Sequence, residues 1–221
     1  MRLLLCSALV MLSFGLVPAS ADQITFGPST NNISFCSLSG GAVTVSAAGF
    51  SSGCVPLAGT GTITGSATWN PTGGSAELGT FSIAMSTMTL TPAGGAVWNS
   101  SGGAGSTFTY SGASGTIVGS ITWSTVTDAT NPIQFAGSLQ ITSASGSLLA
   151  RFPVGTTVGF DFTMNGGAGI LTALSAAPGQ SSNPISSGEV APVPEPGSIL
   201  LLGSGLLAAG SFLRMRRKRI S

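Results

Sequence analysis

Apolar and polar residues alternate through the middle of the chain. In the stretch GTITGSATW, residues 61–69, Ile63, Ala67 and Trp69 fall on one face, and threonine and serine fall on the other. This period of two is typical of a half-buried β-strand. The stretch GTIVGSITW, residues 115–123, repeats the pattern with seven of nine residues identical and both tryptophans in register. We interpret the two stretches as a duplicated strand.

Further strand signals are separated by turns rich in glycine, proline and asparagine. In one of them the apolar face shifts between Met85 and Met88, which predicts a bulge or turn there. No ten-residue stretch of the same region shows a helical stripe. The predicted fold class is therefore all-β, with residues 22–175 forming an antiparallel β-sandwich of the jelly-roll or immunoglobulin-like kind. The further predicted strands cover residues 42–50, 79–91, 106–112, 133–142 and 156–165.

The segment that follows the predicted sandwich has a different composition. Residues 176–193 are rich in proline, serine and glycine and show no apolar periodicity. Such composition predicts a flexible or extended stalk.

The N-terminus has the features of a secretory signal peptide over residues 1–21. Arg2 precedes a short apolar run, and the small residues Ala19 and Ala21 stand at the positions that a signal peptidase requires. We expect cleavage between Ala21 and Asp22, and therefore export. The alternative is an uncleaved anchor helix, which the shortness of the run disfavours.

The C-terminus carries an uncharged run over residues 197–213, followed by a basic tail over residues 214–219. As a helix the run would be about 25 Å long, just enough for the core of a bilayer. Pro194 and Pro196 would place the start of this helix near Gly197, because proline does not fit a helix interior. The predicted topology is one transmembrane helix with a cytoplasmic basic stop, the alternative being a buried helix of a globular domain. The stop consists of Arg214, Arg216, Arg217, Lys218 and Arg219.

Together these features give the C-terminus a family resemblance. VPEPGSILLLGSGLLAAGSFLRMRRKR resembles the PEP-CTERM sorting signal of Gram-negative bacteria, with Pro194, Glu195 and Pro196 before the apolar run. The resemblance implies a transient hold in the inner membrane and recognition near the triplet by an exosortase, a membrane-embedded protease of transpeptidase type. It further implies delivery to the cell surface or to an exopolysaccharide or biofilm matrix. The same tail is also catalogued as an ice-binding-protein C-terminal motif.

Charge is scarce and unevenly placed. Only 6% of residues are charged, against about 25% in an average domain. Six of the seven basic residues lie at the two ends, which leaves Arg151 in the body against six acids. Nucleic-acid binding needs a basic face that neutralises phosphates, so the body is not expected to bind nucleic acid.

Two cysteines, Cys36 and Cys54, remain after Cys6 leaves with the signal peptide. In an oxidising compartment such a pair favours a disulfide, and two buried free thiols are the alternative. A loop of about 18 residues closed by this bond would contribute about 3 kcal/mol by chain entropy. We expect no metal site and no cofactor.

Candidate catalytic residues are few. GFSSG, residues 49–53, fits the nucleophile pattern G-x-S-x-G at Ser51, but the chain has no histidine to act as the base. Asp128, Asp161 and Glu77 could supply the carboxylate pair of a glycoside hydrolase, although isolated acids are more often solvated turn residues. Asp128 lies in a predicted turn, and Asp161 alternates with two phenylalanines, so we expect it to point away from the apolar face. The prediction is a protein without catalytic activity.

The predicted function is that of an exported structural or adhesive protein in an exopolysaccharide or biofilm. The alternative is a carbohydrate- or ice-binding module, with glycoside hydrolysis a distant third. Alternating threonines could present hydroxyls to ice or to extracellular polysaccharide, although they more often form the solvent face of a sheet. Tyr110 and Trp98 are the candidates for exposed aromatic rings that stack on sugars, whereas Trp69 and Trp123 are expected in the core.

Overall fold

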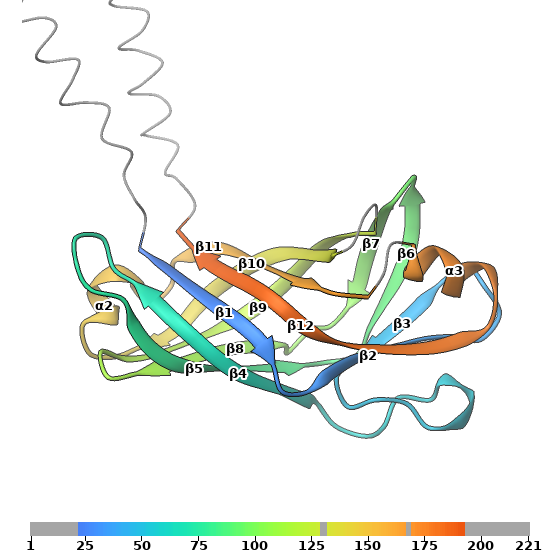
Figure 1. The fold of residues 1–221 in the computed structure, drawn as a ribbon, viewed down its shortest axis with the longest axis horizontal. Helices are drawn as coiled ribbons and strands as arrows, with labels where there is room; N and C mark the ends of the chain where they lie inside the picture. Colours follow the sequence, from blue (N-terminus) through green and yellow to red (C-terminus); the bar gives the residue numbers. More distant parts are fainter. Residues whose placement is uncertain (1–21, 129–131, 167–168, 193–221) are drawn as a thin grey trace, which may run out of the picture.

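The computed structural model describes residues 22–128, 132–166 and 169–192. This part of the chain consists mainly of antiparallel β-strands and includes two short α-helices (Figure 1). The predicted signal peptide (residues 1–21) and the segment from residue 193 onward lie outside the described residues. Neither described α-helix has the length and apolar composition that a membrane crossing requires.

The elements follow one another in a simple order. The helical ones are the 3-10 turn η1 (Ser52–Cys54), α2 (Leu148–Arg151) and α3 (Ile170–Ala176). The strands are β1 (Gln23–Ser29), β2 (Asn32–Ser37), β3 (Val43–Ser46), β4 (Gly61–Asn70), β5 (Glu77–Met85), β6 (Met88–Gly94), β7 (Val97–Gly102), β8 (Thr107–Gly112), β9 (Gly115–Thr127), β10 (Ile133–Ala144), β11 (Thr157–Met164) and β12 (Gly179–Ala191).

The strands form one continuous antiparallel sheet with two closed circuits. Each circuit is a ring of strands in which every strand is hydrogen-bonded to its two neighbours, and the pairings β1–β12 and β9–β7 close the two rings. Strands β9 to β12 lie side by side and belong to both closed circuits. β1, β4, β5 and β8 complete the first circuit, and β2, β3, β6 and β7 complete the second. The predicted all-β antiparallel class is confirmed. The predicted sandwich of two separate sheets is not confirmed, because all twelve strands belong to one hydrogen-bonded sheet.

Strand β12 corrects the prediction of a stalk over residues 176–193. Its first half pairs with β2, and its second half pairs with β1 on one side and β11 on the other. Ile185 and Val190 are fully buried, which fixes the strand's inner face. Pro184 lies where the pairing with β11 ends, a position that tolerates a missing ladder donor. The folded body therefore extends to Ala191 and not to residue 175.

The seven predicted strand segments all contain strands. The duplicated stretches become β4 and β9, and both tryptophans, Trp69 and Trp123, are buried as predicted. The phase shift between Met85 and Met88 marks the break between β5 and β6. Four strands were not predicted: β1, β2, β7 and β12.

An aromatic cluster fills the interior where the two circuits meet. The Phe26 and Phe81 rings lie 4.8 Å apart in the first circuit, and Phe135 and Phe162 stack at 4.7 Å on β10 and β11. Trp123 on β9 contacts Phe162 edge to face at 5.7 Å. Aromatic pairs of this kind contribute about 0.5–1.5 kcal/mol beyond their buried area, so the shared layer β9–β12 holds the two halves together.

Candidate functional site

A pocket of about 380 Å³ opens on the outer face of β1, β4, β11 and β12. The strand register places Asp161, Glu189, Thr25 and Thr68 in one row across these four strands. Their side chains point away from the core, because Phe160, Phe162 and Val190 on either side of the two acids are buried. The outward direction of Asp161 agrees with its predicted alternation.

The rest of the pocket lining is partly polar and partly apolar. Ser66 and Ser187 add hydroxyl groups, Gly27 and Gly188 add no side chain, and the lining also includes Phe26 and Ala67. Gly27 has a φ of +112°, and a Cβ there would meet the carbonyl oxygen of Ser186 at 2.8 Å. This position therefore requires glycine, which allows β1 to approach the backbone of β12 closely at Ser186.

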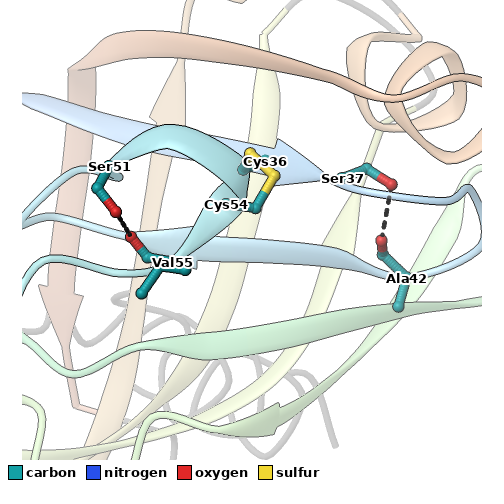
Figure 2. The surroundings of a disulfide bond; sticks show 6 residues. All are labelled: Cys36, Ser37, Ala42, Ser51, Cys54 and Val55. Atoms are coloured by element: carbon teal, nitrogen blue, oxygen red, sulfur yellow. Dashed lines mark hydrogen bonds between the residues drawn. A yellow bond between two sulfur atoms is a disulfide. The ribbon is translucent and has the colours of Figure 1, made fainter.

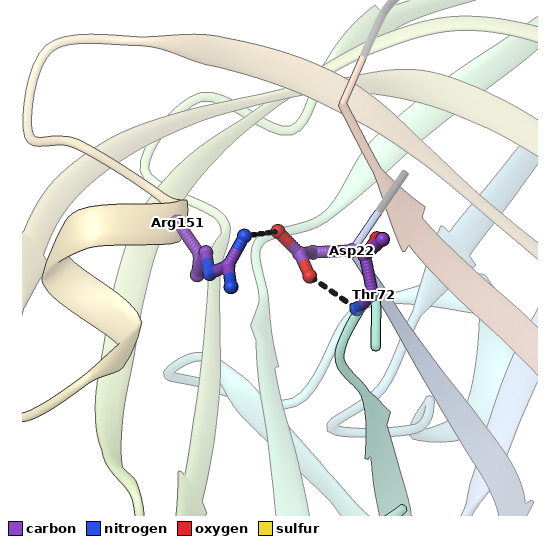
Figure 3. Close-up of polar contacts among 3 residues, drawn as sticks. All are labelled: Asp22, Thr72 and Arg151. Atoms are coloured by element: carbon purple, nitrogen blue, oxygen red, sulfur yellow. Dashed lines mark hydrogen bonds and ion pairs between the residues drawn. The ribbon is translucent and has the colours of Figure 1, made fainter. Parts of the chain in front are cut away.

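Three of the five described acids are bound by other groups of the protein. Asp22 forms an ion pair with Arg151 (N···O 3.3 Å) and accepts a hydrogen bond from the Thr72 N–H at 2.7 Å (Figure 3). Glu77 accepts hydrogen bonds from the N–H (2.8 Å) and the hydroxyl of Ser114.

Asp128 has a structural role that corrects the prediction of a solvated turn residue. Its side chain is only 3% exposed and accepts hydrogen bonds from the N–H groups of Gly169, Leu171 and Thr172 at 2.9–3.2 Å. These donors belong to the first turn of α3, whose N–H groups have no partners within the helix. No local sequence pattern indicates this role, because Asp128 and α3 lie about 40 residues apart in the chain.

Asp161 and Glu189 differ from the other acids. Within the described part of the chain, neither carboxylate has a hydrogen-bond or ion-pair partner, and the two residues are direct neighbours across β11 and β12. Burial and, secondarily, the charge of Glu189 raise the pKa of Asp161. Like charges directly opposite one another destabilise a sheet. A ligand that donates hydrogen bonds to these oxygens would relieve that cost.

Hydroxyl groups also cover the outer face of the neighbouring strands. Ser66, Thr80, Ser111 and Thr116 lie in one register row across β4, β5, β8 and β9. Threonines at alternate positions of β4 and β8 extend this lattice on both strands. The pocket therefore lies beside an uncharged, hydrogen-bonding surface.

The aromatic candidates for sugar stacking are buried, which corrects that prediction. Trp98 is 2% exposed and Tyr110 is fully buried. Burial and the nearby charge of Glu77 raise the pKa of Tyr110 to about 12. Both residues lie at inward positions of their strands, β7 and β8, and thus belong to the core.

The candidate nucleophile Ser51 lies in a turn beside the disulfide. Its hydroxyl donates to the Val55 carbonyl at 3.2 Å (Figure 2). Cys36 and Cys54 form the predicted disulfide, with Cα atoms 5.5 Å apart. The bond fastens the loop between β3 and β4 to the outer face of β2. In the described part of the chain, no three His, Cys, Asp or Glu side chains gather to hold a metal ion.

The chain matches the PEP-CTERM protein-sorting motif over residues 192–218. The motif indicates an exported protein that is sorted by an exosortase through a membrane-anchored signal. No curated protein and no solved structure matches the chain. The triplet Pro194-Glu195-Pro196, the apolar run and the basic stop lie outside the described residues, as do Ala19 and Ala21.

Removing the disulfide is expected to destabilise the body. Replacing Cys36 and Cys54 by serine should lower the free energy of unfolding by about 3 kcal/mol, because the unfolded chain regains the freedom of an 18-residue loop. Urea unfolding of the oxidised protein and the double variant measures this. The exposed Ser51→Ala variant is the control and should differ by less than about 0.5 kcal/mol. An unchanged midpoint after reduction of the wild type would contradict the prediction.

Asp161→Asn is expected to stabilise the body at pH 7 by about 0.5 kcal/mol. Because the pKa of Asp161 is raised, the folded state binds the proton more tightly, and ionisation lowers stability as the pH rises. The gain should fade below about pH 4, where the carboxyl group is protonated in both states.

Glu77→Gln is expected to lower the free energy of unfolding at pH 7, the opposite of the change expected for Asp161→Asn. The Ser114 hydroxyl, and then its N–H, lower the pKa of Glu77, so its ionised form stabilises the fold at neutral pH and this contribution is lost on acidification. Urea unfolding of both variants at pH 7 and pH 3 tests the pair. Destabilisation by Asp161→Asn at pH 7 would refute the assignment of Asp161 as an uncompensated charge.

Proposed function

We propose that residues 22–191 form a non-catalytic binding domain of the cell surface or extracellular matrix, which holds hydroxyl-rich polysaccharide in the Asp161–Glu189 pocket. The observation that carries the proposal is the row of Asp161, Glu189, Thr25 and Thr68 across four strands. Carboxylates accept hydrogen bonds from sugar hydroxyls, and the threonine and serine hydroxyls both donate and accept. The sorting motif supports an extracellular setting for this domain.

The arrangement of the carboxylates supports binding without hydrolysis. A glycoside hydrolase places its acid and its second carboxylate on either side of the scissile bond. Here Asp161 and Glu189 lie side by side on β11 and β12, and the next two strands of the same sheet, β1 and β4, supply Thr25, Ser66 and Thr68. The other two hydrolase candidates, Glu77 and Asp128, are bound to backbone N–H groups.

The recognition mode proposed here uses hydrogen bonds and not aromatic stacking. The large aromatic side chains of the described strands are in the core. Binding of each single sugar unit is therefore expected to be weak, and adhesion would come from repeated contacts along a polymer. A structural or adhesive role in exopolysaccharide fits this mode.

Ice binding is a second candidate, favoured by the hydroxyl row Ser66, Thr80, Ser111 and Thr116. Hydroxyls on neighbouring strands are spaced about 4.8 Å apart. Sheets twist, by about 20–25° between neighbouring strands, so the lattice departs from a plane as it crosses the face. Polysaccharide, which can follow a twisted surface, is the ligand that we propose first.

Titration of the body with exopolysaccharide oligosaccharides tests the proposal by calorimetry. Wild type should bind, and the double variant Asp161→Asn/Glu189→Gln should lose about tenfold or more in affinity, because each hydrogen bond to a charged group contributes about 1.5–3 kcal/mol. Thr109→Val, on the outer face of β8 away from the pocket, is the matched control and should bind as wild type. Equal affinity of the wild type, the double variant and the control would contradict the proposed polysaccharide site. Thermal hysteresis without sugar binding would also contradict it.

A further inference from the structure

The connection between the folded body and the sorting tail is short. Strand β12 ends at Ala191, and the uncharged run begins at Gly197. Five residues lie between them, and a fully extended chain covers at most about 20 Å over this distance. Part of that length must cross the headgroup layer, which is about 5–8 Å thick on each side of the bilayer core.

This tether is shorter than the body that it holds. A compact domain of 170 residues has a radius of gyration of about 15 Å and therefore a diameter of about 40 Å, twice the length of the extended tether. β12 is paired on both sides at its end, with Ile24 opposite Val190 and Gly159 opposite Ala191, so the tether cannot lengthen without breaking the sheet. The end of the body around Ala191 must therefore face the membrane while the tail is attached.

A loop with exposed apolar side chains lies at this end. Residues 145–156 connect β10 to β11 and contain α2, which lies at the same end of the body as the start of β1 and the end of β12 (Figure 1). Arg151 of this loop contacts Asp22, the residue before β1 (Figure 3). Leu149 and Val154 are 47% and 54% exposed.

The loop is held firmly, so the exposure of these side chains is a fixed feature. Leu148 and Phe152 are fully buried and anchor the loop in the core. The N–H groups of Ser147 and Gly155 donate to the carbonyls of Ser114 and Ile141 at 3.0 and 2.8 Å. Leu149 and Val154 are thus presented on a rigid support beside the chain exit.

We propose that Leu149 and Val154 dock the tethered body on the lipid interface of the membrane from which it is later released. The partner is the headgroup–acyl boundary, which accepts apolar side chains beside polar ones. Arg151 is the one charged residue of the 145–156 loop and is already paired with Asp22, so the loop itself brings no unpaired charge to the surface. The short tether keeps the body at a high effective concentration beside the membrane surface, so two apolar side chains are enough to dock it there. The docked body would hold the Pro-Glu-Pro triplet at the membrane surface.

Photo-crosslinking in the full chain, still carrying its tail in the membrane, tests the proposal. A photoreactive amino acid replaces Leu149 or Val154, and in a matched control it replaces Val97. Val97 is 40% exposed and pairs with Thr127, whereas the 145–156 loop contacts Thr116 near the other end of β9. These two positions on β9 lie about 36 Å apart.

We expect at least fivefold more lipid adduct at positions 149 and 154 than at position 97. Inserting twenty Gly/Ser residues after Ala191 should reduce that excess, because such a linker spans about 25 Å on average. Equal lipid labelling at 149 and 97, adducts at 149 to protein in place of lipid, or an excess that survives the insertion would each overturn the proposal. None of these readouts involves polysaccharide, so the result is independent of the proposed binding function.

Discussion

The pairing of β12 is the constraint on which the rest of the structure depends. This strand closes both circuits of the sheet, because it is the neighbour of β11, β1 and β2. Without it three strands would expose unpaired backbone groups, and buried N–H and C=O groups without partners are costly. The same strand contributes Glu189 to the pocket and carries the tether to the sorting tail. The thirteen residues of β12 therefore contribute to the sheet, to the pocket and to the connection with the sorting tail.

Scarcity of charge gives the few charged residues well-defined roles. The ion pair of Asp22 with Arg151 joins the start of β1 to α2, Glu77 holds the turn at Ser114, and Asp128 caps α3 from a distant loop. Asp161 and Glu189 lack such partners in the described part of the chain and line the pocket together. A neutral, hydroxylated surface around one acidic pocket suits a hydrated polymer of sugars, which can be bound by hydrogen bonds without strong electrostatic attraction.

The sequence predicts those parts of the fold that carry a strong local pattern. Strict alternation located β4 and β9, and the phase shift at Met85 located the break before β6. β12 escaped prediction because only Ile185 and Val190 mark its inner face, and a proline and several serines resemble a linker. The pocket is not predicted for the same reason: alternation with phenylalanines indicates that Asp161 faces outward, but its neighbour Glu189 lies in a segment whose composition predicts a stalk. The partners of Asp128 and Glu77 depend on contacts about 40 residues away along the chain, which no local pattern encodes.

Hydrogen exchange of the segment 185–191 tests the central role of β12 most directly. In the folded protein, mass spectrometry should find this segment as strongly protected as β10, with both exchanging only through global unfolding. The loop of residues 71–76 should exchange rapidly and serves as the internal reference. Exchange of 185–191 as fast as that loop, with β10 still protected, would show that these residues form a mobile linker and would contradict the account.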